Sequence, residues 1–364
     1  MRRPIPLGIL FSRSGDYALL SRTSHDGAMA GIEAVNADPR RTIRFEPQER
    51  DPGSRADAYG PLCAELLQIG GLRHIVGCVT SSSRKEVIPL MERHEAMLWY
   101  AAPYEGFEAN ERVIYTHACP NQHIVPLLNY ALPRHGREVF LLGSNYVWGW
   151  ENNRVAREIV GAWNGRILGE RFLPVGDGDV TRIIAEIRAT RPALIVNNMI
   201  GQSSYALLRA LAELGREDPA FRPDRCPVLS CDLMETELPA LAGAAEGHLV
   251  VGPYFADLQP PRSSMEAAAH ASVLVLADLI EAADSADPAA LRRFIGTRVH
   301  QTPLGRLQID ARTQHSHLPV LVGRITGNRF VPVWQSREPI APDPYLSHHD
   351  ARGPLAERPL RVVS

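Results

Sequence analysis

Short hydrophobic runs alternate with longer amphipathic stretches along most of the chain. The short runs predict strands, and the stretches with apolar positions three and four residues apart predict helices. The predicted strands are residues 5–11, 43–45, 74–78, 97–101, 113–116, 139–143, 172–175, 193–197, 228–231 and 248–255. The predicted helices between them are residues 21–36, 56–69, 83–94, 122–135, 151–163, 180–190 (with Asp179 as N-cap), 203–214 and 235–241.

This regular alternation is typical of parallel sheets that are covered by helices on both faces. About nine or ten strands are more than one open sheet usually holds. The 364 residues also correspond to two domains at about 150 residues each. The pattern therefore predicts an α/β fold with two Rossmann-like lobes.

The C-terminal part does not continue this alternation of strands and helices. Helices are predicted over 267–283 and 289–295, followed by strands over 305–309, 318–325 and 330–334. Thr326-Gly327-Asn328 joins the last two strands and is a hairpin signal. The tail from Ser347 is polar and rich in Arg and His, so we expect it to be poorly ordered.

Composition and charge narrow the class of protein. Hydrophobic residues make up 45% and charged residues 22%, which is usual for a soluble protein with sizeable cores. The formal net charge of −2 argues against direct binding of nucleic acid, and no apolar run is long enough to span a membrane. Pro4, Pro6 and Gly8 interrupt the first apolar run, which therefore predicts a strand rather than a signal peptide. The five cysteines lack zinc spacing and fit free thiols, so we expect a cytoplasmic protein.

Catalytic and cofactor motifs do not stand out. The chain has no P-loop, dinucleotide-binding, H-E-x-x-H or C-x-x-C motif, so we expect neither an enzyme nor a cofactor or metal. Ser82-Ser83-Arg84-Lys85 matches S-x-x-K, but the accompanying K-T-G is missing. His315-Ser316-His317 alternates like a strand, and we favour a strand over metal ligation there.

Three polar and aromatic clusters each follow the carboxyl end of a predicted parallel strand, where open α/β sheets bind ligands. They are residues 77–85, 99–108 and 143–151. The hydroxyl run of the first lies at a helix start and suits a carbonyl or carboxylate oxygen, although N-capping alone is the alternative. The second cluster offers aromatic walls and free carbonyls. In the third, Tyr146 and Trp148 share one face if the segment is extended. Core packing is the alternative for the last two.

At these segments the chain resembles the type I periplasmic-binding-protein superfamily, and specifically its branch of short-chain amide and urea receptors, including the amide-sensing regulators of aliphatic amidase operons. The matching segments run in order along nearly the whole chain: 51–53, 80–85, 103–108, 120–122, 143–146, 253–255, 315–316 and 334–345. The resemblance implies two lobes joined by three crossovers that close on a small ligand in a cleft. We expect crossovers near 116–120, 246–253 and 323–328. Lobe 1 is then 1–118 plus 252–325, lobe 2 is 119–251 plus 326–346, and 347–364 is the tail.

The resemblance also implies which residues contact the ligand. The expected ligand-binding residues are Thr80, Ser81, Tyr100, Ala102, Pro103, Tyr104, Tyr146 and Trp148. Ser81 and Tyr146 would hydrogen-bond an amide, and the carbonyl near Pro103 would accept from its nitrogen. Val79, Ala102, Trp148 and Gly149 stand where the amide regulators have Tyr, Thr, Tyr and Pro, so we expect a reshaped pocket. Val79, Glu105 and Gly149 are the expected pocket-shaping residues, with Glu105 either meeting the ligand or bracing its loop.

The leading hypothesis is a non-catalytic cytoplasmic receptor for a small amide or urea-like ligand. It would regulate amide-utilising genes through a partner that resembles an RNA-binding antiterminator, and it could form homo-oligomers. The alternative is the substrate-binding component of an ABC importer for amides, urea or branched-chain amino acids, which would be periplasmic.

Overall fold

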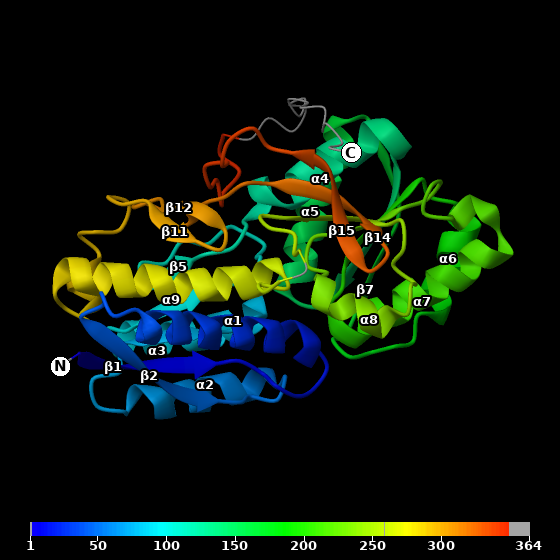
Figure 1. The fold of residues 1–364 in the computed structure, drawn as a ribbon. Helices are drawn as coiled ribbons and strands as arrows, with labels where there is room; N and C mark the ends of the chain where they lie inside the picture. The colour runs from blue at the N-terminus through cyan, green and yellow to red at the C-terminus, as the bar shows by residue number, and fades with distance from the viewer. Residues whose placement is uncertain (1, 258, 349–364) are drawn as a thin grey trace. The chain divides into compact units, whose positions relative to one another are not determined.

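The computed structural model describes residues 2–257 and 259–348. Within them the chain forms two compact units: unit 1 comprises residues 2–118, 257 and 259–318, and unit 2 comprises residues 119–256 and 319–348. Strands and helices alternate in each unit (Figure 1). The predicted α/β class with parallel sheets is therefore confirmed.

Unit 1 contains a parallel sheet with the strand order β2-β1-β3-β4-β5. Its strands are β1 (Arg3–Leu10), β2 (Ile43–Arg50), β3 (His74–Gly77), β4 (Met97–Tyr100) and β5 (Val113–Tyr115). A small antiparallel sheet holds β11 (His300–Thr302), β12 (Gly305–Ile309) and β13 (Ser316–His317). The strand order reverses at β1 and β3, and open α/β sheets bind ligands beyond the carboxyl ends of strands at such a point.

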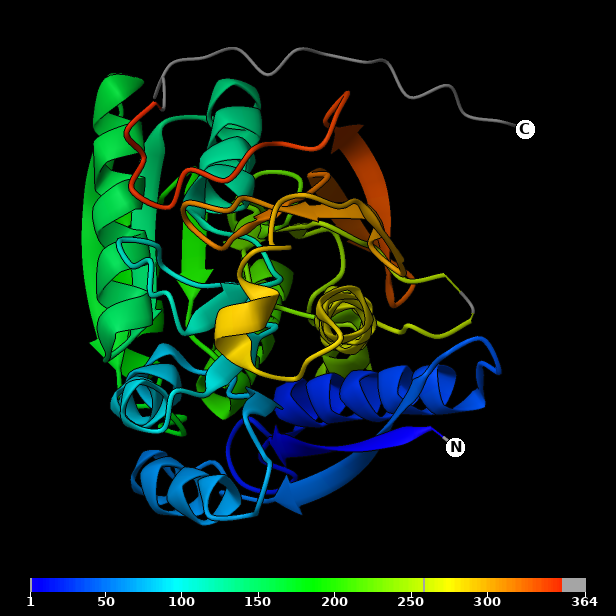
Figure 2. The same ribbon diagram turned by 90° about the vertical axis from the view of Figure 1, so that its left-hand side faces the viewer.

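The helices of unit 1 cover both faces of its sheet. They are α1 (Ala18–Ala37), α2 (Ala56–Leu67), α3 (Ser81–Arg93), α9 (Ser264–Ala283) and α10 (Pro288–Leu291). Figures 1 and 2 both show α1, in blue, packed against α9, in yellow. Gly27 permits this close approach, because a Cβ there would lie 2.1 Å from the carbonyl oxygen of Glu266.

Unit 2 contains a seven-stranded sheet with the order β15-β14-β10-β9-β8-β6-β7. Its strands are β6 (Glu138–Ser144), β7 (Arg166–Leu173), β8 (Leu194–Asn198), β9 (Val228–Ser230), β10 (Leu249–Gly252), β14 (Leu321–Thr326) and β15 (Arg329–Gln335). Its helices are α4 (Ile124–His135), α5 (Val147–Ala162), α6 (Thr181–Thr190), α7 (Gly201–Glu217) and α8 (Leu238–Leu241), with 3₁₀ turns η1 (Pro120–Gln122), η2 (Pro219–Phe221) and η3 (Glu235–Glu237). The strand order reverses at β6 and β8, so their carboxyl ends are the equivalent edge of this unit.

The predicted hairpin is confirmed, since β14 and β15 pair through Thr326 and Arg329 with only Gly327 and Asn328 between them. Both loop residues have a positive φ, as the two-residue turns that fit twisted strands require. The structure places the last crossover earlier than expected, between Leu318 and Pro319. The reason is that β14 pairs with β10 on one side and β15 on the other, so the predicted lobe 1 segment 252–325 loses this strand to unit 2.

The two strands whose predicted ranges omit the most residues lie at the edges of their sheets. β2 extends to Arg50 and β7 begins at Arg166, whereas the hydrophobic runs predict only 43–45 and 172–175. Both are edge strands with partly exposed side chains, so polar residues occupy many of their positions and weaken the hydrophobic signal. In α6 the N-cap is Val180 rather than Asp179, although Asp179 Oδ1 still accepts from the Thr181 N–H at 3.1 Å. Except for residues 347 and 348, the predicted tail lies outside the described residues.

Candidate functional site

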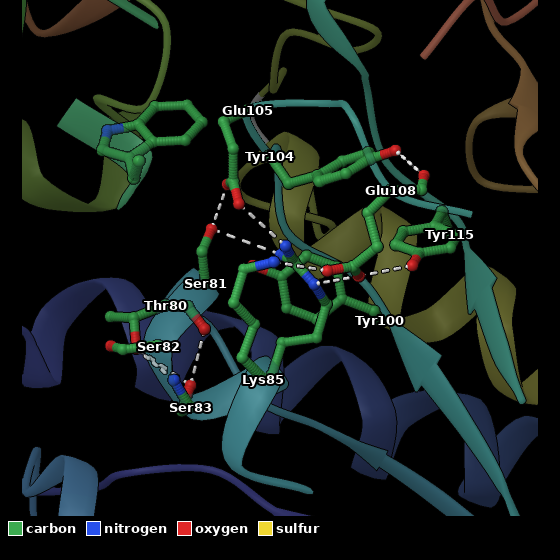
Figure 3. A network of polar contacts seen from close by, with 12 residues as sticks. Thr80, Ser81, Ser82, Ser83, Lys85, Tyr100, Tyr104, Glu105, Glu108 and Tyr115 are labelled. Carbon is green, nitrogen blue, oxygen red and sulfur yellow. Dashed lines mark hydrogen bonds and ion pairs between the residues drawn. The ribbon is translucent and has the colours of Figure 1, made fainter. Parts of the chain in front are cut away.

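The hydroxyl run after β3 begins α3 and satisfies much of its own hydrogen bonding (Figure 3). Thr80 is the N-cap, and its Oγ1 accepts from the Ser83 N–H at 3.2 Å. Its hydroxyl donates to Ser83 Oγ at 2.9 Å, and Ser83 Oγ donates to the Thr80 carbonyl at 2.7 Å. The capping alternative therefore accounts for Thr80 and Ser83.

Ser81 lies at the first position of α3 and its side chain turns toward the loop after β4. Its hydroxyl donates to Glu105 Oε2 and accepts from Arg84 Nη1 at 3.2 Å. Only 1% of Ser81 is exposed. Glu105 thus braces the loop through Ser81 and Arg84, which is one of the two roles expected for it.

Arg84 is the centre of this edge of unit 1, although the sequence analysis does not select it. Its side chain is fully buried, with Nη2 3.0 Å from Glu105 Oε1 and Nε 2.8 Å from Glu108 Oε1. The guanidinium carbon lies 4.7 Å from the ring centre of Tyr100 and 4.8 Å from that of Tyr104. Burying a charge is costly unless it is paired and hydrogen-bonded, and both conditions are met here.

Glu108 connects the buried arginine to its surroundings. Burial by itself would raise the pKa of Glu108, but the Arg84 charge and the hydrogen bonds from Lys85 and Tyr115 outweigh it and lower the pKa to about 2. The carboxylate is therefore ionised at neutral pH and balances Arg84.

An aromatic stack closes the other side of this network. The rings of Tyr115 and His315 are parallel with centroids 4.1 Å apart, and Tyr104 stacks on Tyr115 at 4.8 Å. Burial lowers the pKa of His315 to about 3, so the ring is neutral. Its Nδ1 lies 2.6 Å from the Thr313 carbonyl and carries the proton, and its Nε2 contacts the Tyr104 hydroxyl, whose own proton is directed to the Glu108 carbonyl at 2.8 Å. No group of three or more His, Cys, Asp or Glu is placed to hold a metal ion among residues 2–257 and 259–348.

The remaining expected residues of unit 1 gather around the same network. The Tyr100 hydroxyl donates to the Val79 carbonyl at 2.5 Å, and Tyr100 itself is fully buried. Ala102 and Pro103 are also buried in the loop that follows β4. The structure thus brings the expected residues 79–81, 100 and 102–105 together at the carboxyl ends of β3 and β4.

The expected residues of unit 2 lie at the carboxyl end of β6. Tyr146 is partly buried and is the N-cap of α5, and Trp148 lies in the first turn of this helix. The segment is therefore not extended, and the two side chains do not alternate on one face as a strand would place them. Trp148 is 2% exposed and its Nε1 donates to the Asn198 carbonyl at 3.1 Å, so it packs beside the end of β8.

Gly149 has a packing role that the sequence analysis does not assign. A Cβ at this position would lie 2.1 Å from the Ser144 carbonyl oxygen, so only glycine lets α5 approach the end of β6.

We expect Gly149→Ala to lower the free energy of unfolding by about 1–3 kcal/mol, the usual cost of overpacking, as measured by urea denaturation.

Gly161→Ala is the matched control, since Gly161 lies in the same helix with no atom within 4 Å of the added carbon. Alanine is the better helix former, so this variant should be up to about 1 kcal/mol more stable than wild type. Equal effects of the two substitutions would contradict the assigned role of Gly149.

The sequence analysis does not identify three acidic residues after β9 as candidate functional residues. Asp232 is 6% exposed, and its Oδ2 has no hydrogen-bond partner within the described residues. Burial raises the pKa of Glu235 and of Glu237 to about 7. Glu237 accepts from the Tyr205 hydroxyl at 2.5 Å and from the Met234 N–H at 2.8 Å. Asp232 directly follows the predicted strand 228–231, so its position at a strand end is the signal that could have found it.

The family model described as periplasmic binding protein domain matches residues 5–265 and 259–351. The chain belongs to this family. The family and the similar structures are binding proteins rather than enzymes.

Solved structures of the same fold cover nearly the whole chain. A solute-binding protein of an ABC transporter from R. palustris, in complex with 4-hydroxybenzoate, has a TM-score of 0.80 at 17% identity and covers 92% of this chain and 98% of its own. A leucine-binding protein from Thermotoga maritima MSB8 has a TM-score of 0.78 at 16% identity, covering 91% and 98%. The amino acid ABC transporter substrate-binding protein from Pseudomonas fluorescens Pf-5 has a TM-score of 0.77 at 18% identity, covering 94% and 97%.

These similarities establish the two-lobed type I fold of the family. The cytoplasmic location, the gene-regulatory role and the antiterminator partner expected from the sequence find no support in the family or in these structures. Among the described residues, none of the helices is both long and apolar enough to cross a bilayer.

Proposed function

We propose that this protein is the solute-binding component of an ABC importer for a small polar solute. The observation that carries the proposal is the family match along the chain, together with solved relatives of the same fold that are themselves transporter solute-binding proteins. This function was the alternative in the sequence analysis, and it takes precedence over the amide-sensing regulator.

The solute class comes from the sequence resemblance to amide and urea receptors. We place the solute at the carboxyl ends of the parallel strands. In unit 1 this edge holds Ser81, Tyr100 and residues 102–104, and in unit 2 it holds Tyr146 and Trp148. Each edge combines aromatic surface with polar groups, which is the composition of small-molecule sites. That both edges contribute to one ligand site stays a prediction.

Titration calorimetry with the purified protein tests binding. The solutes are acetamide, butyramide, urea, benzoate and leucine, and we expect one of the amides or urea to bind at a single site. Tyr146→Phe should weaken that binding about 5- to 30-fold, because it removes one hydrogen-bonding hydroxyl worth about 1–2 kcal/mol.

Tyr345→Phe is the control, because Tyr345 is 47% exposed and lies outside the proposed edge. Its affinity should equal that of the wild type. Equal affinities of wild type and Tyr146→Phe for the best solute would contradict the placement of Tyr146 in the site.

Deleting the gene from its host distinguishes the importer from the regulator. For an importer, uptake of the radiolabelled solute should fall while expression of amide-degrading enzymes at a given internal solute level stays the same. Unchanged uptake with altered enzyme expression would favour the amide-sensing regulator and would overturn the importer proposal.

A further inference from the structure

The hydrogen-bonding capacity of Ser81 is limited by its neighbours. A serine hydroxyl has one proton to donate and two lone pairs that accept. The proton of Ser81 is directed to Glu105 Oε2, and one lone pair accepts from Arg84 Nη1 at 3.2 Å. What Ser81 retains for any further partner is one lone pair.

The direction of the bond between Ser81 and Glu105 follows from the ion pair beside it. Arg84 Nη2 donates to Glu105 Oε1 at 3.0 Å, and both side chains are almost completely buried. A carboxylate held by an arginine has no proton to offer, so it accepts from Ser81. Figure 3 shows Glu105 above Ser81, with dashed lines from its carboxylate to the serine and to the guanidinium.

Neighbouring hydroxyl protons are engaged as well. Tyr100 donates to the Val79 carbonyl at 2.5 Å, and Thr80 donates to Ser83 Oγ at 2.9 Å. The hydroxyl protons of Tyr100 and Thr80, like that of Ser81, are therefore not free to meet a ligand oxygen.

We propose that Glu105 is a specificity-determining positioning residue that makes Ser81 a hydrogen-bond acceptor, so that the ligand group meeting Ser81 is an N–H donor of an amide, urea or amidine and not a carboxylate oxygen. The inference rests on the proposed function, because it takes Ser81 as a ligand contact. It reverses the sequence-based expectation that the Ser81 hydroxyl donates to a ligand oxygen.

A carboxylate ligand would set a lone pair against the remaining lone pair of Ser81 and would leave both without a proton. Unpaired polar groups in a site shielded from water lower affinity strongly. The protein should therefore differ from its structural relatives in complex with 4-hydroxybenzoate and benzoate, whose ligands carry a carboxylate.

The test measures a selectivity ratio with matched ligands. Acetamide, acetamidine and acetate form one series, and benzamide, benzamidine and benzoate form the second. Titration calorimetry on the full chain gives the affinity for each. For the wild type we expect the amide or the amidine of a series to bind at least tenfold more tightly than the carboxylate.

Glu105→Gln should reduce or remove this preference. Arg84 can only donate, so the glutamine oxygen must turn toward Arg84 and its NH₂ group toward Ser81. Ser81 then accepts from the glutamine, and its own proton becomes available to a ligand oxygen. The ratio of amide to carboxylate affinity should fall at least tenfold.

Glu108→Gln is the matched control. It removes the same charge from the same arginine, but Glu108 bonds to Arg84, Lys85 and Tyr115 rather than to Ser81. It should lower the affinity for all ligands of a series equally and keep their ratio. If Glu105→Gln does not fold, as judged by circular dichroism, Ser81→Ala serves instead and should bring the ratio close to one.

The outcomes separate this inference from the function on which it rests. A wild type that binds the carboxylate most tightly, or equal shifts of the ratio in the two glutamine variants, overturns the role of Glu105 and leaves solute binding intact. Absence of binding by every solute in both series counts against the inference and the proposed function together.

Discussion

Arg84→Met is expected to lower the free energy of unfolding by about 3–5 kcal/mol, because it removes one partner of a buried ion pair and leaves the others without compensation. Glu105 would then be buried beside a thioether, and Glu108 would lose the 2.8 Å bond from Nε. Urea denaturation followed by circular dichroism measures the change.

An exposed arginine of the same unit provides the control. Arg55 pairs with Asp57 at 3.2 Å, but both side chains are more than 70% exposed. Arg55→Met should therefore cost less than about 1 kcal/mol. A loss of less than 1 kcal/mol in Arg84→Met would show that the buried network does not hold this edge together.

Glu235→Gln is expected to gain stability relative to the wild type as the pH rises from 5 to 8, by about 2 kcal/mol. Burial raises the pKa of Glu235 to about 7, with a further contribution from Glu237. In the unfolded chain the carboxyl group loses its proton near its ordinary value of about 4.3. The folded wild type therefore holds the proton over a range in which the unfolded chain has released it, and its stability falls as pH rises through about 7. A glutamine side chain does not ionise in this range, so Glu235→Gln does not lose this stability as the pH rises.

The quantity to measure is the difference in the free energy of unfolding between Glu235→Gln and the wild type at each pH. Burial lowers the pKa of His74 and His248 to about 4 and that of His315 to about 3, so these residues destabilise the folded state as the pH falls below their unfolded values. Their effect opposes that of the acids in the wild-type curve and cancels in the difference. Urea denaturation at pH 5, 6, 7 and 8 measures this difference.

Glu213→Gln is the control for this experiment, because Glu213 is exposed in α7 of the same unit. Its stability relative to the wild type should not change with pH in this range by more than a few tenths of a kcal/mol. The same flat behaviour in Glu235→Gln would show that Glu235 is not held protonated in the folded protein.

Part of the site could be predicted because strand ends are visible in the sequence. The polar residues that follow the predicted strands 74–78 and 97–101 do gather at one edge of unit 1. Their partners could not be predicted, since Arg84 and Glu105 are 21 residues apart and meet only because β3 and β4 are neighbours in the sheet. The burial of Ser81 and of Trp148 likewise depends on residues that are distant in the sequence and become neighbours only in the folded sheet. Substituting either residue should therefore affect stability even without a ligand.

The sequence by itself determined the alternation of strands and helices, the α/β class and the hairpin at Gly327 and Asn328. Each of these follows from hydrophobic periodicity or turn chemistry among residues close in the chain. Only the tertiary structure decided that β14 belongs to unit 2, that Glu105 takes the Ser81 proton and that the partly buried Glu235 lies beside a second acid, Glu237, which helps to raise its pKa. Strand pairing, ion pairing and burial depend on residues that are distant in sequence, and local patterns do not encode which of these come together.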